Sequence, residues 1–360
     1  MDLRFVKHSQ QKGGGYLLST FAVKIRRVTV MPHPNADRLE LGTVDDYHVV
    51  IAKGEYQTGD LAVYIPEQAI VPPQIIAELG LEGKLHGADH NRVRAMKLRG
   101  ELSQGLLYRP APWPEHWVEG TDVAEELGIV KWEPPIPISM QGDVERAPFG
   151  TIFRTYTDIE NVKAFPNVLQ EGEEVIFTEK LHGSCLVAGL LDGQRVVSSK
   201  GIAGHGLVLR ESATNVYWRA ALQEGVFDKL AAFLSDTGQT QAMLFGEVLG
   251  VQDLTYGFVG GQIGFRAFDL YTAQGFADYD DFVAFCERYG LPRVPEIYRG
   301  PFSKTVMQHH TDGGSTIAAH LREGVIIRPV RERDELDIGR VILKSVSGDY
   351  LTRKGGTELQ

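Results

Sequence analysis

The segment 173–191 reads EEVIFTEKLHGSCLVAGLL and contains two apolar runs separated by Lys180-Leu181-His182-Gly183. The runs EEVIF and SCLVAGLL each have the length and apolar content of a buried strand. Lys180 is therefore expected at a strand end inside a domain. Burial and neighbouring cations lower the pKa of an amine in such a place and free its lone pair.

The tetrapeptide KLHG occurs a second time, at Lys84–Gly87, within LEGKLHGADHN. A lysine three residues before a glycine is typical of nucleotidyl-transfer sites, in which the amine attacks an α-phosphate. The spacing itself is weak evidence, because Lys-x-x-Gly occurs four times in the chain. Lys84 is predicted to lie in a solvated loop, where an amine keeps a pKa of about 10.4 and is a poor nucleophile. For Lys180, the local sequence supports a nucleophile and an ordinary strand-end lysine equally.

Length and composition indicate a two-domain globular protein of 360 residues with a net charge of −10. Residues 1–110 carry a charge of +2, residues 111–180 carry −9 and residues 181–360 carry −3, so the acid concentrates in the middle. Two cysteines exclude a disulfide framework and a four-cysteine zinc site. No secretory leader or run of about 20 apolar residues is visible, which predicts a cytoplasmic protein with no membrane contact. Nothing indicates an obligate protein partner.

The pattern along the chain predicts three regions. Short β-rich runs over 1–110 predict an all-β, OB-like barrel of about five strands that binds nucleic acid. Residues 111–148 read as an acidic, proline-containing linker with one short helix in TDVAEELG. Residues 149–360 mix strands and helices without a βαβ rhythm, which predicts an α+β domain on antiparallel sheets. Its helices are expected over 212–222, 226–235, 279–289 and 316–322.

A series of polar residues on apolar strands follows Lys180 in a fixed order: VSSK (197–200), LFGEVLG (244–250), FRAFD (265–269), EGVIIRP (323–329) and VILKSV (341–346). The series resembles motifs I, Ia, III, IIIa, IV and V of covalent nucleotidyltransferases, the ATP-dependent polynucleotide ligases and capping enzymes. Lys-x-His-Gly resembles the form of the second RNA ligase family. The OB-like region before the core is similar to the ATP-dependent RNA ligases of the Deinococcus type. The resemblance implies an ATP-grasp-like ligase domain, ATP with Mg²⁺ or Mn²⁺, and a nicked RNA or RNA-containing duplex as substrate.

The resemblance also implies roles for individual residues around the nucleotide. Lys180 would be the nucleophile, Glu179 would contact adenine, and Gly183 would let the backbone pass close to the nucleotide. Phe268 would stack on adenine, whereas Phe265, on the other face of its strand, would be core. A separate set would act on ribose, metal and phosphate: Glu247 on the ribose and metal, Glu323 on the metal, Lys344 on the α-phosphate, and Lys200 and Arg328 on nucleic acid.

Several of these residues have equally ordinary explanations, and three positions depart from the family pattern. Lys200 could be a surface lysine in a turn, and Arg328 could form a structural ion pair. Val346 stands where a second lysine is frequent, so either Arg353 or Lys354 replaces that cation or the contacts to pyrophosphate are fewer. Cys185 stands where RNA ligases often have asparagine, and a thiol is a poor hydrogen-bonding group. His182, when protonated, cannot accept hydrogen bonds from a metal's water shell as an aspartate would.

Two alternatives compete with the ligase. A non-catalytic RNA-binding protein would rely on the OB-like region, but joint retention of Lys180, Glu247, Glu323 and Lys344 disfavours it. A GTP-dependent capping-type enzyme would use the same chemistry, but these enzymes normally place the OB module after the core. The sequence therefore favours an RNA ligase that seals 3′-OH/5′-phosphate nicks in RNA repair, through a lysyl-AMP intermediate and an adenylylated 5′ end.

Overall fold

The structure is a computed structural model that describes residues 21–133, 140–147, 154–156 and 158–356. The first domain is built from short strands: β1 (Lys24–Arg27), β2 (Thr29–Pro32), β3 (Leu39–Val44), β4 (Tyr47–Ala52), β5 (Leu61–Ile65), β6 (Ala69–Ile70), β7 (Met96–Leu98), β8 (Glu101–Ser103) and β9 (Leu106–Tyr108), with helix α1 (Pro73–Glu78). Strands β1-β5-β9 and β2-β3-β4 form two three-stranded antiparallel sheets, and β7-β8 form a hairpin.

Strand β5 lies between the two apolar cores of this domain. Val63 and Ile65 pack into one core, and Ala62 and Tyr64 pack into the other. Because side chains alternate across a strand, a strand covered on both faces is apolar throughout, which explains the run LAVYI.

Much of the predicted linker is part of the first domain. Trp117, Val123 and Ile129 are buried in the same core as Ile25 and Val63. Strand β10 (Val130–Lys131) pairs with β6, and α2 (Ala124–Leu127) is the predicted short helix. The interpretation of this stretch as linker is therefore wrong up to Lys131. Apolar residues about six positions apart face inward there, while the acids that suggested a linker face solvent. Residues 134–139 and 148–153 of the predicted boundary region lie outside the described part of the chain.

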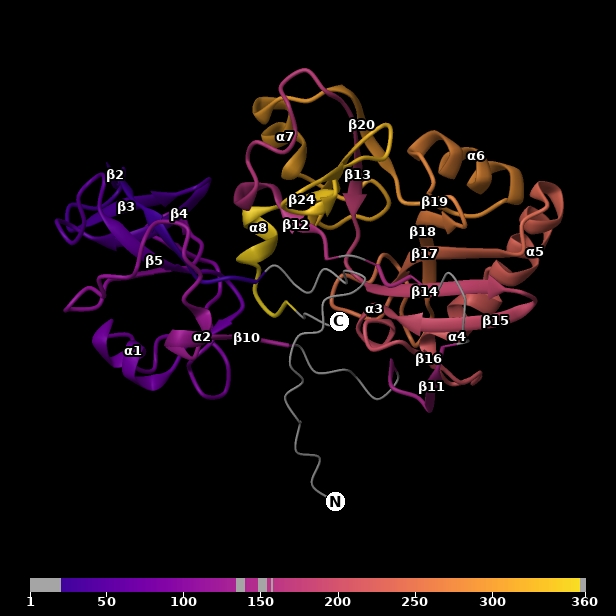
Figure 1. Cartoon of the computed structure of the whole chain (residues 1–360), viewed down its shortest axis with the longest axis horizontal. Coiled ribbons are helices and arrows are strands. Elements are labelled where there is room, and N and C mark those ends of the chain that lie inside the picture. Colours follow the sequence, from indigo (N-terminus) through magenta and orange to yellow (C-terminus); the bar gives the residue numbers. More distant parts are fainter. Residues whose placement is uncertain (1–20, 134–139, 148–153, 157, 357–360) are drawn as a thin grey trace.

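The second domain contains two five-stranded sheets (Figure 1). The first has the order β12-β24-β21-β13-β20, with bounds β12 (Glu160–Asn161), β24 (Leu343–Val346), β21 (Gly324–Pro329), β13 (Glu174–Lys180) and β20 (Glu296–Pro301). The second has the order β15-β14-β17-β18-β19, with bounds β15 (Gln194–Ser199), β14 (Ser184–Leu191), β17 (Gln241–Leu249), β18 (Gly264–Thr272) and β19 (Gly275–Phe276). All neighbours are antiparallel except β12 and β24.

The segment 181–183 connects the two sheets, because β13 belongs to the first and β14 to the second. Lys180 therefore lies at the seam between the sheets. The remaining short strands are β11 (Val144–Arg146), which pairs with β16 (Leu207–Leu209), and the hairpin of β22 (Asp334–Glu335) with β23 (Gly339–Arg340).

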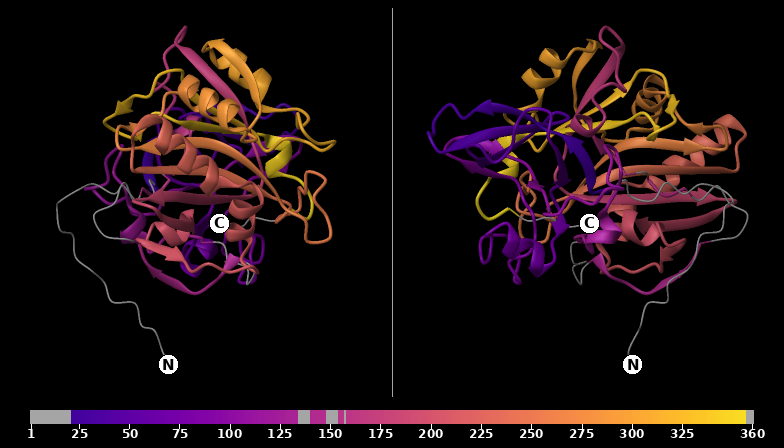
Figure 2. Two further views of the ribbon diagram at one scale, coloured as in Figure 1. Left: turned by 90° about the vertical axis from the view of Figure 1, so that its right-hand side faces the viewer. Right: turned by 60° about the vertical axis from the view of Figure 1, so that its left-hand side comes forward.

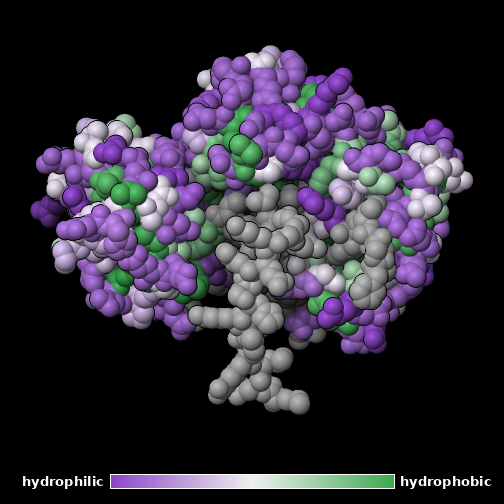
Figure 3. Space-filling model, in the orientation of Figure 1, coloured by the Kyte–Doolittle hydropathy of each residue, from purple (hydrophilic) through white to green (hydrophobic). Residues whose placement is uncertain are grey.

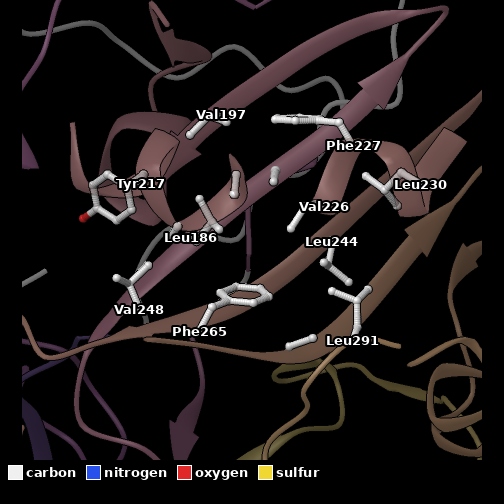
Figure 4. Packing of buried hydrophobic residues seen from close by; sticks show 14 of the residues in the cluster. Leu186, Val197, Tyr217, Val226, Phe227, Leu230, Leu244, Val248, Phe265 and Leu291 are labelled. Carbon is white, nitrogen blue, oxygen red and sulfur yellow. The ribbon is translucent and has the colours of Figure 1, made fainter. Parts of the chain in front are cut away.

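The main core of this domain lies between the second sheet and a layer of helices (Figure 4). Leu186, Leu244 and Phe265 come from the sheet, and Tyr217 and Leu230 come from the helices. The helices of the domain are α3 (Lys200–Ala203), α4 (Val216–Gln223), α5 (Val226–Thr237), α6 (Tyr279–Tyr289), α7 (Lys304–Thr311) and α8 (Gly348–Leu351), with a 3-10 turn η2 at Val162–Ala164. Three of the four predicted helices are confirmed within a few residues, but residues 316–322 form a loop.

The first domain rests beside the first sheet and helix α8 (Figures 1 and 2). Lys304 Nζ lies 2.9 Å from Asp46 Oδ2, and Lys97 Nζ lies 2.7 Å from Asp349 Oδ1 on α8. The surface in Figure 3 is largely hydrophilic, with separate small apolar areas. Within the described ranges, no helix has the length and apolar character needed to cross a membrane.

Candidate active site

Lys180 forms an ion pair with Glu323 at the seam between the sheets. The Lys180 Nζ and Glu323 Oε1 atoms are 2.5 Å apart, and both side chains are largely buried. The pairing is built into the sheet, because Lys180 lies opposite Gly324, the residue after Glu323. Burial pushes the pKa of Glu323 upward, but Lys180 and His182 outweigh it and lower the pKa to about 2. Glu323 is therefore an anion beside the lysine across the physiological pH range.

Lys344 lies on the same face of the first sheet as Lys180. It pairs with Ile326 across β24 and β21, two residues beyond Gly324, so the side-chain alternation puts both lysines on one face. Burial and the charges of Lys180 and Lys200 lower the pKa of Lys344 to about 8. A buried lysine whose pKa is lowered by neighbouring cations marks a place suited to an anion.

Lys200 lies at the edge of this positive region. Its Nζ atom is 2.5 Å from Asp158 Oδ1, and Lys131 Nζ from the first domain lies 3.9 Å from the other oxygen of Asp158. The pKa of Asp158, which burial raises, is lowered on balance by Lys200, Lys131 and Lys344. Asp158 thus links Lys131 of the first domain to Lys200 and Lys344 of the second domain.

Gly183 has no room for a side chain. A Cβ atom there would meet the carbonyl oxygen of Val248 at 2.2 Å and Glu247 Cγ at 2.9 Å. The backbone of Gly183 also hydrogen-bonds the Glu247 carboxylate, yet burial raises the pKa of Glu247 to about 8. Cys185 lies opposite Glu247 in the β14–β17 register, and burial raises the pKa of its thiol.

Glu179 is buried, and hydrogen bonds reach only one of its two carboxylate oxygens within the described part of the chain. Its Oε2 atom accepts hydrogen bonds from the backbone N–H and the hydroxyl of Thr316, at 2.8 and 2.6 Å. Its Oε1 atom has no hydrogen-bond partner among the described residues. A buried carboxylate oxygen without a donor is costly, so this atom is suited to accept from a ligand.

Phe268 and Glu179 converge through the loop 312–322. Phe268 is half-buried, and both Phe268 and Ile317, the residue after Thr316, pack against the apolar cluster that contains Leu181. The ring centroid of Phe268 lies 4.9 Å from that of Tyr156. Phe265 is buried in the main core, as strand alternation predicted.

Two basic residues weighed in the sequence analysis, Lys84 and Arg328, have other partners. Lys84 donates from its Nζ atom to the Gly80 carbonyl at 2.6 Å, just after the end of α1, so its role is local. Arg328 is 3% exposed and lies 2.9 Å from Asp269 Oδ1 and 2.6 Å from Glu332 Oε1. The prediction that Arg328 binds nucleic acid is therefore wrong, because the guanidinium is enclosed by carboxylates.

His182 has neighbours that sequence patterns did not reveal. Its Nε2 atom lies 2.8 Å from Asp253 Oδ1, and its Nδ1 atom lies 2.8 Å from the Tyr350 hydroxyl. Arg353, a candidate replacement for the second lysine of motif V, pairs with Asp253 at 3.0 Å and is engaged there. These contacts join residues about 70 to 170 positions apart, and no local sequence signal marks them.

The arrangement is that of a covalent nucleotidyltransferase. A strand-end lysine lies at the seam of two antiparallel sheets, with carboxylates and further lysines around it, and a β-barrel domain precedes it in the chain. An RNA ligase family model matches residues 173–346, and an OB-fold domain model matches residues 22–110. The catalytic domain belongs to the RNA ligase family, and the predicted order of an OB-like barrel followed by a nucleotidyltransferase domain is confirmed.

Solved RNA ligase structures from Naegleria gruberi have the same layout. A lysine-to-alanine variant with ATP and Mn has a TM-score of 0.77 and 25% identity, covering 92% of this chain and 98% of that chain. A glutamate-to-alanine variant with AMP and Mn gives the same values, and a structure with PPi gives a TM-score of 0.76 over 92% and 97%. No curated protein sequence matches the chain.

Proposed function

We propose that the protein is an ATP-dependent RNA ligase that seals 3′-OH/5′-phosphate nicks in RNA or RNA-containing duplexes. The observation that carries this proposal is the buried Lys180–Glu323 pair beside Lys344. Three successive displacements at phosphorus are needed: attack of Lys180 on ATP, transfer of AMP to a 5′-phosphate, and attack of a 3′-hydroxyl. Such displacements depend mainly on positioning and charge neutralisation, which this site provides.

In the first step, the neutral amine of Lys180 attacks the α-phosphorus of ATP. A nitrogen–phosphorus bond forms, the bond to the bridging oxygen breaks, pyrophosphate leaves, and one amine proton passes to solvent. Lys344 would hold the α-phosphate and balance its developing charge, because it shares a sheet face with Lys180.

The carboxylates fit a divalent cation that is held largely by phosphate and water. No group of three or more His, Cys, Asp and Glu side chains among the described residues is arranged to hold a metal ion. Mg²⁺ and Mn²⁺ do not need such a cage, because one or two carboxylates with phosphate oxygens suffice. Glu323 would provide an ionised oxygen, and a nearby cation would favour ionisation of Glu247, whose pKa of about 8 reflects its buried site. The metal would neutralise phosphate charge.

Adenosine would be read by Glu179, Phe268 and Glu247. The open Oε1 atom of Glu179 would accept from the exocyclic amine of adenine, and the exposed side of Phe268 would stack on the base. Glu247 would contact the ribose, with Gly183 giving the backbone its close approach.

The RNA would lie across the two domains. Lys200 is a candidate for the strand near its 3′ end, and Lys131 brings the OB domain to the same carboxylate. We further propose that the protein acts in RNA repair and lies in the cytoplasm. Cys185 and Cys286 are both free thiols, which is usual in the reducing environment of that compartment.

Label transfer from α-³²P-ATP tests the proposal, with wild type, Lys180→Ala and Lys84→Ala compared in Mg²⁺ or Mn²⁺. Acid-stable label should appear on wild type and Lys84→Ala and be absent from Lys180→Ala. Wild type should then seal nicked RNA duplexes. Labelling by GTP alone would indicate capping chemistry, and no label from either nucleotide would leave a non-catalytic RNA-binding protein.

A further inference from the structure

His182 is fixed by hydrogen bonds on three sides. It is 3% exposed, its Nε2 atom lies 2.8 Å from Asp253 Oδ1, and its backbone N–H donates to the Tyr256 hydroxyl at 2.8 Å. A carboxylate accepts only, so Nε2 carries the hydrogen that faces Asp253. On the other side of the ring, Nδ1 lies 2.8 Å from the Tyr350 hydroxyl, and the two groups share a hydrogen bond.

The ring borders the reacting pair directly. His182 Nδ1 lies 3.5 Å from Glu323 Oε2, and the other oxygen of Glu323 lies 2.5 Å from Lys180 Nζ. His182 is also in the three-residue connection between the two sheets, which has no ladder partner of its own. A shift of the imidazole would therefore displace both Glu323 and the connection that follows Lys180.

Tyr350 is held in place by the short helix α8 and its flanks. The N-cap residue Ser347 donates from its backbone N–H to the Glu323 carbonyl at 2.9 Å and accepts from the Tyr350 N–H at 3.3 Å. Arg353 lies over the Tyr350 ring, 3.7 Å from its centroid. The helix thus connects to Glu323 at one end and to His182 at the other.

The OB domain braces the same helix. A Cβ atom on Gly348 would lie 3.3 Å from Leu102 of strand β8, and Lys97 pairs with Asp349. Tyr350 is consequently enclosed between the two domains and the nucleophile segment, and it is 4% exposed.

We propose that Tyr350 is a positioning residue for lysine nucleotidylation: its hydroxyl fixes His182, which in turn sets Glu323 and Lys180 for attack on the nucleotide. In this proposal Tyr350 acts through His182 and not through a contact of its own with the nucleotide. The inference rests on the proposed function, because it assigns a role in the first of the three steps.

Tyr350→Phe is the test, because it keeps the ring over which Arg353 lies and removes only the hydroxyl. Single-turnover label transfer from α-³²P-ATP would be followed over a range of ATP concentrations. At saturating ATP, the rate constant should fall about 10- to 100-fold, as expected for a misplaced reacting pair. The apparent ATP affinity should stay within about twofold, because no nucleotide contact is removed. Tyr298→Phe is the matched control, since the Tyr298 hydroxyl donates to the Pro301 carbonyl at the exposed end of the edge strand β20.

The outcomes separate this inference from the proposed function. No label on wild type would refute the ligase itself. Label on wild type with an unchanged Tyr350→Phe rate would overturn only the role of Tyr350, as would equal losses of rate, ATP affinity and thermal stability. Should Tyr350→Phe fail to fold, Asp253→Asn removes the acceptor charge on the opposite side of the ring, and the same selective loss of rate is expected.

Discussion

Lys180 and Glu323 form an ion pair, 2.5 Å between Nζ and Oε1, across strand β13 and the start of strand β21. The carboxylate keeps a pKa of about 2 despite its burial, because Lys180 and His182 are beside it. The carboxylate therefore lies within ion-pair distance of the amine that we propose as the nucleophile, and a change of charge at Glu323 should act on that amine directly.

Glu323→Gln should lower the rate of label transfer by about 10²- to 10³-fold, the range seen when one preorganised electrostatic group is lost. The amide keeps the shape of the side chain but has no charge to offer Lys180 or a divalent cation. Glu335→Gln is a suitable control, because Glu335 is exposed in the β22–β23 hairpin and pairs with the half-buried Arg333 at 2.6 Å. A Glu323→Gln rate within about threefold of wild type would contradict the assigned role.

Lys344→Met should abolish label transfer and yet stabilise the fold at neutral pH. Burial and neighbouring lysines lower the folded-state pKa of Lys344 from 10.5 to about 8, so its protonated form opposes folding below pH 8. That penalty disappears as pH rises toward 10.5. The gain in the free energy of unfolding should be on the order of 1–3 kcal/mol at pH 7, from about 1.4 kcal/mol per pKa unit, and smaller at pH 10. Denaturant unfolding at the two pH values measures it, and an equal or larger gain at pH 10 would refute the cause.

The lowered pKa of Lys344 also predicts how the ATP affinity of wild type changes with pH. Lys344 loses its charge as pH rises through about 8, so the affinity for ATP should fall above that pH. Lys344→Arg, whose guanidinium remains charged, should retain its own ATP affinity from pH 7.5 to 9.5. Nucleotide titrations at both pH values check this, and parallel declines in the two proteins would exclude Lys344 as the titrating group.

Asp269→Asn should destabilise the second domain severely, because Asp269 is fully buried between two arginines. Its carboxylate lies 2.9 Å from Arg328 and 2.7 Å from Arg340. Although burial raises the pKa of Asp269, the two arginines lower it on balance. Uncompensated buried charge costs about 3–5 kcal/mol. Arg328→Ala should act the same way, lowering the melting temperature without changing the salt dependence of RNA binding.

The control for this network is the exposed pair of Arg299 with Asp280. Arg299→Ala should change the free energy of unfolding by no more than about 1 kcal/mol. A stable Arg328→Ala protein with weakened RNA binding would restore the nucleic-acid role that the structure argues against.

The sequence could point to Lys180 as the candidate nucleophile because each motif is a strand that carries one polar residue, a pattern that is visible without tertiary information. It also separated Phe265 from Phe268 by strand alternation. The sequence could not decide whether Arg328 binds a phosphate or forms a structural ion pair. Strand β21 is covered on both faces, so its residues do not alternate in polarity. Likewise, the acidic composition of residues 111–131 indicated a linker, although Trp117 and Val123 face the core of the first domain.

Contacts between segments that are far apart in the sequence could not be predicted, for a different reason. Residues 316–322 have helical composition, but Thr316 gives its N–H and hydroxyl to Glu179, 137 positions earlier. A tertiary hydrogen bond of this kind overrides local propensity, and no spacing in the sequence encodes it. Tyr350 and Asp253 were missed in the same way.

Base selectivity should depend on Glu179 and, more weakly, on Thr316. The open Oε1 atom of Glu179 can accept from the amino group of adenine, whereas guanine presents a carbonyl at that position, which a carboxylate repels. Glu179→Gln should therefore lower the preference for ATP over GTP in label transfer by about 10- to 100-fold, the value of a hydrogen bond to a charged group. Thr316→Val removes one of two donors to Oε2 and leaves the backbone donor, so a loss of about fivefold is expected. Thr237→Val is the control, because the Thr237 hydroxyl donates to the Phe233 carbonyl at the exposed end of α5. If Thr316→Val impaired selectivity as much as Glu179→Gln, the loop itself rather than the carboxylate oxygen would read the base.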